Sequence, residues 1–204
     1  MDDLTPVRLR DGTAAFVVPL LHANREALQE EYEHLSNETR FDRFLTSVPR
    51  LTEPMLDRLV DDVDGVDHIA LVAIVVTEDG IEQPLGLARI VRYPDDPATA
   101  DVAVTVEDAW QGRGVATALL EVLMQHRPEG VTRIDTVVSE TNAASLAMLR
   151  HLGDAEVSPP RAGTRRVVID LPAPAAAAGL PRPVSRVAPA RRAAARRRTS
   201  PARR

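Results

Sequence analysis

Two glycines at the entrance to a helix form the clearest candidate binding site in the chain. After a short apolar strand, the chain enters a helix through Gln111, Gly112, Arg113 and Gly114, with Val115 and Ala116 in the first turn. Glycine permits positive φ and leaves no Cβ in the way of a ligand, and a first helical turn presents unpaired N–H groups. Arg113 adds a fixed charge. The stretch therefore predicts a phosphate or pyrophosphate site, with a plain turn into a packing helix as the alternative.

Two common nucleotide signatures do not describe this loop. The Lys-Ser/Thr ending of a Walker loop is missing after Gly114, and the spacing G-x-G-x-x-G is not met. The loop is therefore neither a P-loop nor a dinucleotide fingerprint.

Asp101 is an ionisable residue in a place that packing does not favour. It interrupts the apolar strand ADVAVTV (100–106), next to Val102. A lone carboxylate is costly in a core, so Asp101 either takes part in chemistry or starts its strand at a solvent-exposed edge. Glu107 and Asp108 follow the strand and are expected to be solvated loop acids.

The remaining elements give the order that must position these residues. Helical spacing, caps and apolar runs predict strands at 5–12, 68–76, 85–93, 100–106, 132–139 and 164–171 and helices at 21–35, after Ser36, after Thr52, at 114–126 and at 142–152, the last ending at Gly153. The three central strands form a meander. This order predicts an α/β fold, a mixed, mostly antiparallel sheet with helices on its faces, over residues 1–171.

Composition separates this domain from a C-terminal tail. There is no cysteine, which excludes disulfides and thiolate metal sites, and we expect no metal. All 25 basic residues are arginine. Up to Leu171, the chain contains 16 of these arginines and 30 acidic residues, a net charge of −14. The N-terminus is unlike a signal peptide, and no apolar run reaches the roughly 18 residues of a membrane span. A cytoplasmic protein is expected.

Residues 172–204 are predicted to be a disordered, basic tail. Of these 33 residues, 26 are Ala, Arg or Pro, and nine are Arg. Arginines bind nucleic acid through phosphates, but no aromatic residue interleaves them for base stacking. Contact with the acidic domain is another alternative. We favour a composition-driven extension and do not expect nucleic acid to be its main partner.

The loop and its neighbours resemble a known family. Gln111-Gly112-Arg113-Gly114-Val115-Ala116 resembles the Q/R-x-x-G-x-G/A signature of the GNAT N-acetyltransferase superfamily, and the element order matches over most of residues 5–171. Asn142 falls where many members have a coenzyme-contacting Asn. The stretches SNETRFDRF (36–44), VDHIALVAI (66–74), GLARIVR (86–92) and ADVAVTVEDAWQGRG (100–114) are similar to the bacterial Pat-like protein lysine acetyltransferase branch.

The resemblance implies a GNAT fold that binds acetyl-CoA as cosubstrate. In that family the loop holds the pyrophosphate, and the strand before it splays from its neighbour. Backbone N–H groups of Val104, Thr105 and Val106 would then hold the pantetheine arm and polarise the thioester. The usual general acid, a Tyr on the helix after Asn142, is absent, because the stretch reads Ala147-Met148-Leu149.

The resemblance also implies an amine acceptor and a base. A free lysine has a pKa of about 10.4, so about one in a thousand is nucleophilic at pH 7. Asp101 stands where the Pat-like branch carries Glu and is the candidate base. His68 either lines the acceptor site or is structural, and Arg40 and Arg43 are expected on a solvated helix face. Acceptors considered are a protein lysine and an aminoglycoside- or polyamine-like amine; a non-catalytic acyl-CoA-binding regulator is the alternative.

Overall fold

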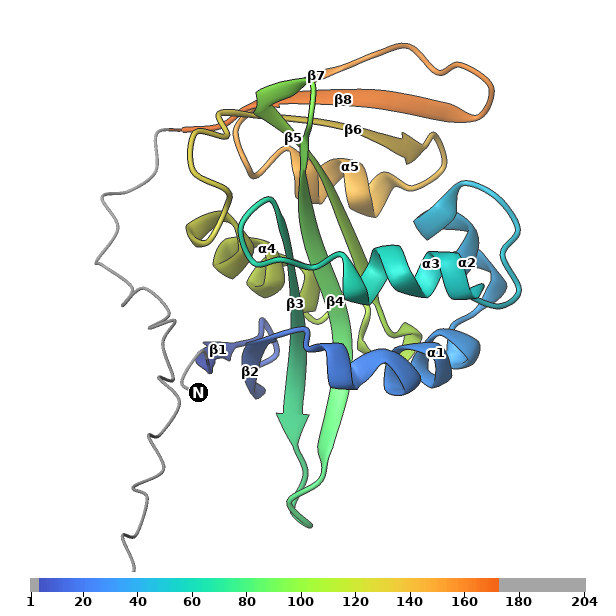
Figure 1. Cartoon of the computed structure of the whole chain (residues 1–204), viewed down its shortest axis with the longest axis vertical. Helices are drawn as coiled ribbons and strands as arrows, with labels where there is room; N and C mark the ends of the chain where they lie inside the picture. The colour runs from blue at the N-terminus through green and yellow to red at the C-terminus, as the bar shows by residue number, and fades with distance from the viewer. Residues whose placement is uncertain (1–3, 173–204) are drawn as a thin grey trace, which may run out of the picture.

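The computed structural model describes residues 4–172 and shows one sheet with helices on both faces (Figure 1). The predicted tail lies, from residue 173 on, outside the described residues. The strands are β1 (Thr5–Arg8), β2 (Ala14–Pro19), β3 (His68–Val76), β4 (Glu82–Tyr93), β5 (Asp96–Val106), β6 (Arg133–Ser139), β7 (Asp154–Val157) and β8 (Thr164–Asp170). The helices are α1 (Arg25–His34), α2 (Asn37–Phe44), α3 (Glu53–Leu56), α4 (Val115–Gln125) and α5 (Ala143–Leu149).

In the described part of the chain, eight strands follow the order β1-β2-β3-β4-β5-β6-β8-β7. Neighbours are antiparallel except β5 and β6, which are parallel. The predicted mixed sheet is confirmed. β2 and β7 were not predicted, and both are short strands.

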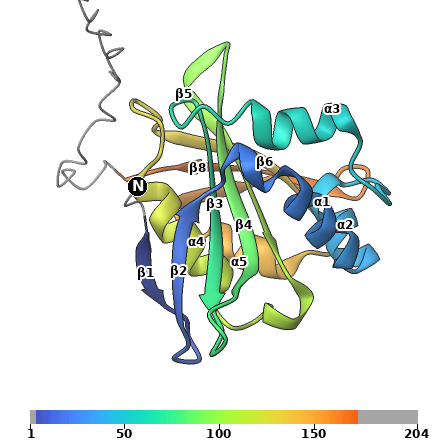
Figure 2. The same cartoon turned by 60° about the horizontal axis from the view of Figure 1, so that its bottom comes forward.

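The sheet buries different residues on its two faces. Ala88 and Ile90 of β4 belong to the main core, which α4 completes with Leu119 and Leu123. On the opposite face, Leu87 packs with residues near α1 and after α3. Alternation along β4 explains the division, since successive side chains point to opposite faces. Helices cover both of these faces (Figure 2). Among residues 4–172, no helix is long and apolar enough to cross a membrane.

Gly153 has a different role from the one predicted. α5 ends at Leu149, and the backbone of Gly153 is not in the left-handed region, so it is not the helix-terminating glycine. A Cβ at Gly153 would instead overlap the carbonyl oxygen of Asp170 on β8. Gly153 therefore allows the close approach of the chain entering β7.

We expect Gly153→Ala to destabilise the fold by about 1–3 kcal/mol, because the added methyl overpacks against backbone that cannot rotate away. Thermal unfolding followed by circular dichroism checks this. An unchanged Tm would mean that the added methyl group causes no steric clash at this position.

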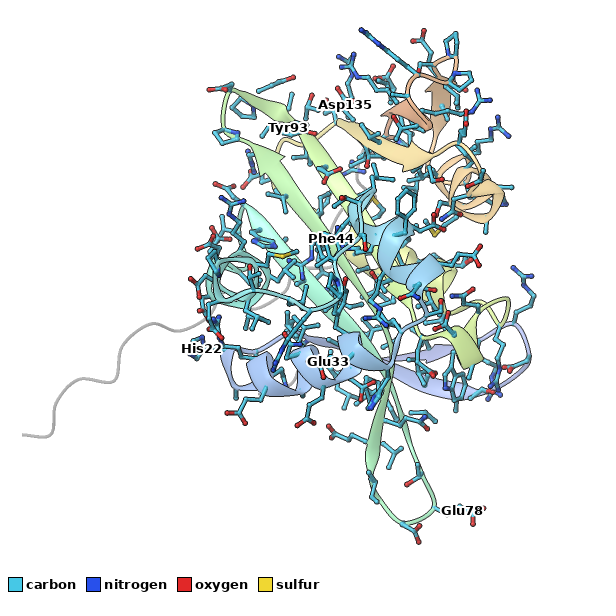
Figure 3. The ribbon with its side chains drawn as sticks, turned by 90° about the vertical axis from the view of Figure 1, so that its right-hand side faces the viewer. His22, Glu33, Phe44, Glu78, Tyr93 and Asp135 are labelled. Carbon is cyan, nitrogen blue, oxygen red and sulfur yellow. The ribbon has the colours of Figure 1, made fainter. Side chains whose placement is uncertain are left out.

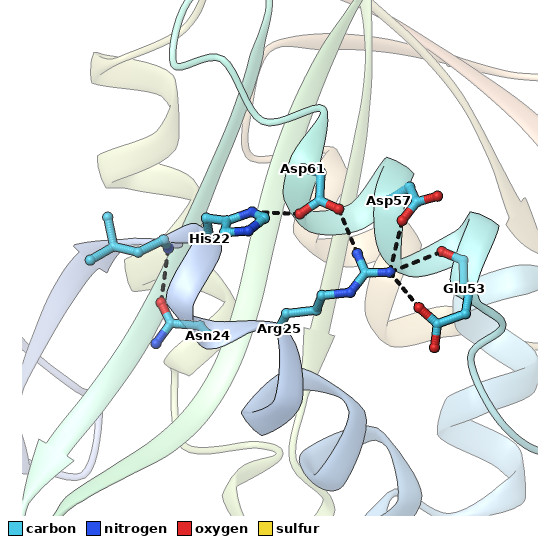
Figure 4. A network of polar contacts seen from close by, with 7 residues as sticks. His22, Asn24, Arg25, Glu53, Asp57 and Asp61 are labelled. Atoms are coloured by element: carbon cyan, nitrogen blue, oxygen red, sulfur yellow. Dashed lines mark hydrogen bonds and ion pairs between the residues drawn. The ribbon is translucent and has the colours of Figure 1, made fainter.

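An ion-pair network fastens the start of α1 to α3 and the π-helical turn that follows it (Figure 4). The guanidinium of Arg25 lies 2.7 Å from a carboxylate oxygen of each of Glu53, Asp57 and Asp61. His22 Nδ1 lies 2.6 Å from the other oxygen of Asp61. One cation thus bridges three acids and offsets part of their mutual repulsion.

Arg25→Ala is expected to lower the Tm, and raising the salt concentration should narrow the difference from the wild type, because salt screens the exposed acids. Differential scanning calorimetry in low and high salt measures both. A Tm difference that does not depend on salt would mean that packing of the Arg25 side chain, not its charge, joins these elements.

Candidate functional site

β5 and β6 form a fork whose closed end is short. They pair only at Thr99–Arg133 and Ala100–Ile134, after which the strands diverge. A cavity of about 270 Å³, the fork cavity, lies between them and is walled by the ends of α2 and α5. The strand splay expected from the resemblance is therefore present. Beyond Ala100, polar backbone groups on the fork side of β5 have no partner strand.

Asp101 lies directly beyond the last paired residues and lines the fork cavity. β5 begins at Asp96, so Asp101 is inside the strand, opposite Val91, and not at its solvent-exposed start. Burial raises the pKa of its carboxyl above the ordinary value, against hydrogen bonds from Thr136 and from the Val102 N–H and the charge of Arg43. A partly buried carboxylate with a raised pKa at a cavity is suited to accept a proton.

The closed end of the fork is fixed by a tyrosine. The hydroxyl of Tyr93 donates a hydrogen bond to the carbonyl oxygen of Asp135 at 2.9 Å, and the two residues lie together at one end of the molecule (Figure 3). Tyr93 also lines the fork cavity. Its pKa is raised by burial and by the charges of Asp101 and Asp135, so the phenol stays protonated.

The glycine loop has the backbone geometry of an anion cradle. Gly112 (φ 72°) and Gly114 (φ 95°) both occupy the left-handed region, and α4 begins at Val115. A Cβ on Gly112 would meet no atom within 4 Å, so the space beside it is open. At Gly114 a Cβ would lie 2.9 Å from the backbone nitrogen of Arg10. The first glycine keeps the cradle open, and the second lets the β1–β2 turn pack against it.

Two side chains of the loop already have protein partners. Arg113 Nε donates to Asp11 at 2.5 Å, and its guanidinium lies 3.8 Å from the centre of the Trp110 ring. Hydrogen bonds from Thr13, and then from Arg113, lower the pKa of Asp11 to about 2. Gln111 Nε2 donates to Thr39 Oγ1 at 3.0 Å. The cradle is therefore mainly backbone, since Asp11 offsets the charge of Arg113.

The other predicted coenzyme residues surround the fork. Val104 lines the fork cavity, whereas Thr105 lines a second cavity on the face that α1 and α2 cover. The carbonyl oxygen of Val106 accepts from Gln111 Nε2 at 3.4 Å. Val115 is buried in the core, and Ala116 is partly buried in the first turn of α4.

Asn142 caps α5 and joins it to α2. Its Oδ1 accepts from the backbone N–H of Ser145 at 2.8 Å, and its Nδ2 donates to Asp42 Oδ2 at 2.7 Å. The amide is thus at the edge of the fork, with both ends bonded to protein groups.

Asp108 has a structural role that the sequence did not indicate. Its carboxylate accepts from the backbone N–H of Ser36 at 2.7 Å, from Ser36 Oγ at 2.9 Å and from Thr39 Oγ1 at 2.6 Å. Burial opposes this charge, but the bonds from Thr39 and Ser36 outweigh it and lower the pKa. Asp108 therefore anchors the start of α2 to the glycine loop while staying exposed to solvent, as expected, whereas Glu107 is partly buried. The partners of Asp108 lie about 70 positions earlier, so no local signal indicates this role.

The second cavity, the helix-side cavity, has a volume of about 310 Å³. Its walls are mainly apolar side chains of α1, β3 and β4, with some charged residues among them. It meets the fork cavity at Arg43 and Phe44 of α2, which line both. Figure 3 shows Phe44 between α2 and the sheet. Phe44 packs on Tyr32, whereas Phe41 of the same helix is exposed.

A buried pair, His68 and Arg89, lies on the same face of the sheet as Asp101. Arg89 pairs with Ala70 and Ala103, and His68 and Asp101 are each two residues from those partners. His68 Nε2 lies 3.1 Å from Arg89 NH1. Burial and the charge of Arg89 lower the pKa of His68, so the neutral ring accepts this bond. Of the two alternatives for His68, these contacts favour a structural role. Arg89, which lines the helix-side cavity, was not singled out from the sequence.

Comparison with known proteins gives the family. Residues 22–154 match the acetyltransferase (GNAT) family. The chain is 32% identical over 149 residues to the acetyltransferase Pat of Mycolicibacterium smegmatis, covering 72% of this chain and 43% of that protein. It is 31% identical over 146 residues to an acetyltransferase of Pseudomonas aeruginosa, covering 71% of this chain and 77% of the relative. The crystal structure of the GNAT domain of S. lividans PAT superposes with a TM-score of 0.71 and 32% identity, covering 82% of this chain and 97% of that domain.

These relatives differ in length. The chain spans less than half of the M. smegmatis protein but nearly all of the S. lividans domain. The family match covers more than half of the chain, and the matched residues include the glycine loop, the fork and Asp101. The chain belongs to the GNAT family of acetyltransferases, whose cosubstrate is acetyl-CoA.

Proposed function

We propose that this enzyme acetylates a primary amine by direct attack on the thioester of acetyl-CoA, with Asp101 as the base. The observation that carries this proposal is the partly buried carboxyl of Asp101 at the closed end of the fork, beside a cavity. The amine nitrogen bonds to the acetyl carbon as the carbon–sulfur bond breaks. Its proton passes to Asp101, directly or through water, and the thiolate takes a proton from solvent.

The backbone of the loop supports a site for the pyrophosphate. Gly112 and Gly114 shape the cradle, and the free N–H groups of the first turn, from Val115 and Ala116, favour an anion. Gln111 and Arg113 frame it from either side. The unpaired edge of β5, at Val104, Thr105 and Val106, suits the amide groups of a pantetheine arm. Asn142 reaches the same arm if its bond to Asp42 is exchanged.

Two acceptor classes remain to be separated. Similarity to proteins named Pat makes a protein lysine the first to test, and a small amine is the second. The apolar walls of the helix-side cavity suit the methylenes of either, and its acids attract any cation. We also propose a cytoplasmic location, where acetyl-CoA is made.

Free-thiol release from acetyl-CoA, measured against a panel of amines and a lysine-bearing protein, tests the proposal. We expect turnover on at least one class, and calorimetry should show acetyl-CoA binding in the absence of acceptor. Binding without turnover on any acceptor would instead support a non-catalytic acyl-CoA-binding regulator.

A further inference from the structure

Arg89 is a buried cation without an acidic partner. Its side chain is 4% exposed, in the wall of the helix-side cavity. NH1 contacts the neutral His68 ring, NH2 donates to the carbonyl oxygen of Leu59 at 3.1 Å, and Nε has no partner. Within residues 4–172, no carboxylate lies within ion-pairing distance of this guanidinium. An unpaired buried charge is costly and is rarely retained for packing alone.

Arg43 places a second guanidinium on the same wall. It lies 4.8 Å from the centre of the Phe44 ring and, among the described residues, it too has no carboxylate partner within ion-pairing distance. Burial and then the charge of Arg43 lower the pKa of Arg89 to about 9, so Arg89 remains charged at pH 7. Two like charges that disfavour each other therefore share one part of the cavity, and an anion between them would relieve both.

The acids of the cavity gather at its other end. Glu82 is at the start of β4, seven residues before Arg89, and Glu107 follows the end of β5. Glu31 of α1 is close enough to Glu107 for its pKa to be raised by that charge as well as by burial. Asp101 lines the adjoining fork cavity, and its charge acts on both guanidiniums, but its carboxyl is needed as the base. The helix-side cavity is thus acidic at one end and cationic where it meets the fork cavity.

We propose that Arg43 and Arg89 form an anion subsite for a carboxylate of the acceptor, so that the substrate is an amino acid. The carboxylate is held by charge-assisted hydrogen bonds, after small side-chain shifts, and the amine of the same molecule faces Asp101. The inference rests on the proposed acetyl transfer and narrows its acceptor to a small molecule that carries both groups.

Matched pairs of acceptors test the subsite in the full chain. Each amino acid is compared with the amine that lacks its carboxylate: lysine with 1,5-diaminopentane, and β-alanine with ethylamine. At saturating acetyl-CoA, we expect kcat/KM to favour the carboxylate member by about 10- to 100-fold, the range of a charge-assisted hydrogen bond. Arg89→Gln and Arg43→Gln should each bring the ratio of the two rates close to one, and Arg43→Lys should retain part of the preference.

Arg92→Gln is the matched control. Arg92 is on the same strand, faces the opposite side, and pairs with Asp67, so its loss should leave the preference intact. Equal rates on both members of each pair, faster turnover on a lysine-bearing protein than on any amino acid, or an equal loss on both members in the arginine variants would overturn the subsite. If no acceptor turns over, the proposed transfer fails. Calorimetry with CoA present then decides the subsite: tighter binding of lysine than of 1,5-diaminopentane supports it, and equal binding refutes it.

Discussion

Asp101→Asn is expected to reduce kcat/KM for the acceptor by about 10²- to 10⁴-fold, the usual contribution of a positioned general base. The amide has nearly the shape of the carboxyl but cannot take the amine proton. Binding of acetyl-CoA should be unchanged, because the glycine loop and the unpaired edge of β5 remain intact. Thiol-release kinetics and calorimetry on the same preparation measure the two effects separately.

The same variant should be more stable than the wild type at pH 7. The folded pKa of Asp101 is raised, so the folded state binds its proton more tightly than the unfolded chain does. The stability that this carboxyl contributes is therefore lost as the pH rises from its ordinary value through the folded one. A neutral amide avoids this loss, and the Tm should rise. A variant that is both fully active and less stable would mean that Asp101 is a structural residue.

Gly114→Ala is expected to have the largest effect on folding among the loop variants. Its Cβ would lie 2.9 Å from the backbone nitrogen of Arg10, in a backbone region that alanine disfavours. Together, these effects should cost about 2 kcal/mol or more, a drop in Tm of roughly 4–8 °C. Coenzyme binding should fall as well, because Gly114 precedes the first turn of α4.

Gly112→Ala is the matched comparison for this prediction. Its Cβ meets only open space, so the stability loss should be limited to the backbone strain of about 1–2 kcal/mol. Because that space is the proposed cradle, the Kd for acetyl-CoA should rise by about tenfold, or about 1.4 kcal/mol. Calorimetric titration of both variants with acetyl-CoA measures these affinities. Unchanged coenzyme affinity in Gly112→Ala would mean that the pyrophosphate does not bind on this side of the loop.

The elements that the sequence predicted well have strong local signals. β3 has the predicted bounds because nine consecutive residues are mostly large and apolar, and α2 starts after Ser36 because that side chain accepts from the Thr39 N–H. β2 and β7 were not predicted, because the formation of short strands depends more on pairing with neighbouring strands than on their own residues. Gly153 was misread because a glycine after a helix usually terminates it, whereas here strand approach requires it.

The residues of the candidate site also fall into those that the sequence indicated and those that only the fold brings together. The glycine loop and Asp101 were found because their residue types are unusual for their positions. The contacts of Asp108 with Ser36 and of Asn142 with Asp42 join residues 72 and 100 positions apart. The contact of Arg89 with His68 depends on strand register, which one sequence does not reveal. Only the folded chain brings these partners together, and they position α2 between the two cavities.

The pH dependence of kcat/KM tests the central claim, that Asp101 is the base, most directly. Both the acceptor amine and Asp101 must lose a proton, so log kcat/KM of the wild type should rise with slope 1 below the pKa of the amine and with slope 2 below that of Asp101, which lies above the ordinary 3.8. In Asp101→Asn, the residual activity should keep slope 1 throughout. The same steepening at low pH in both proteins would contradict the assignment of Asp101.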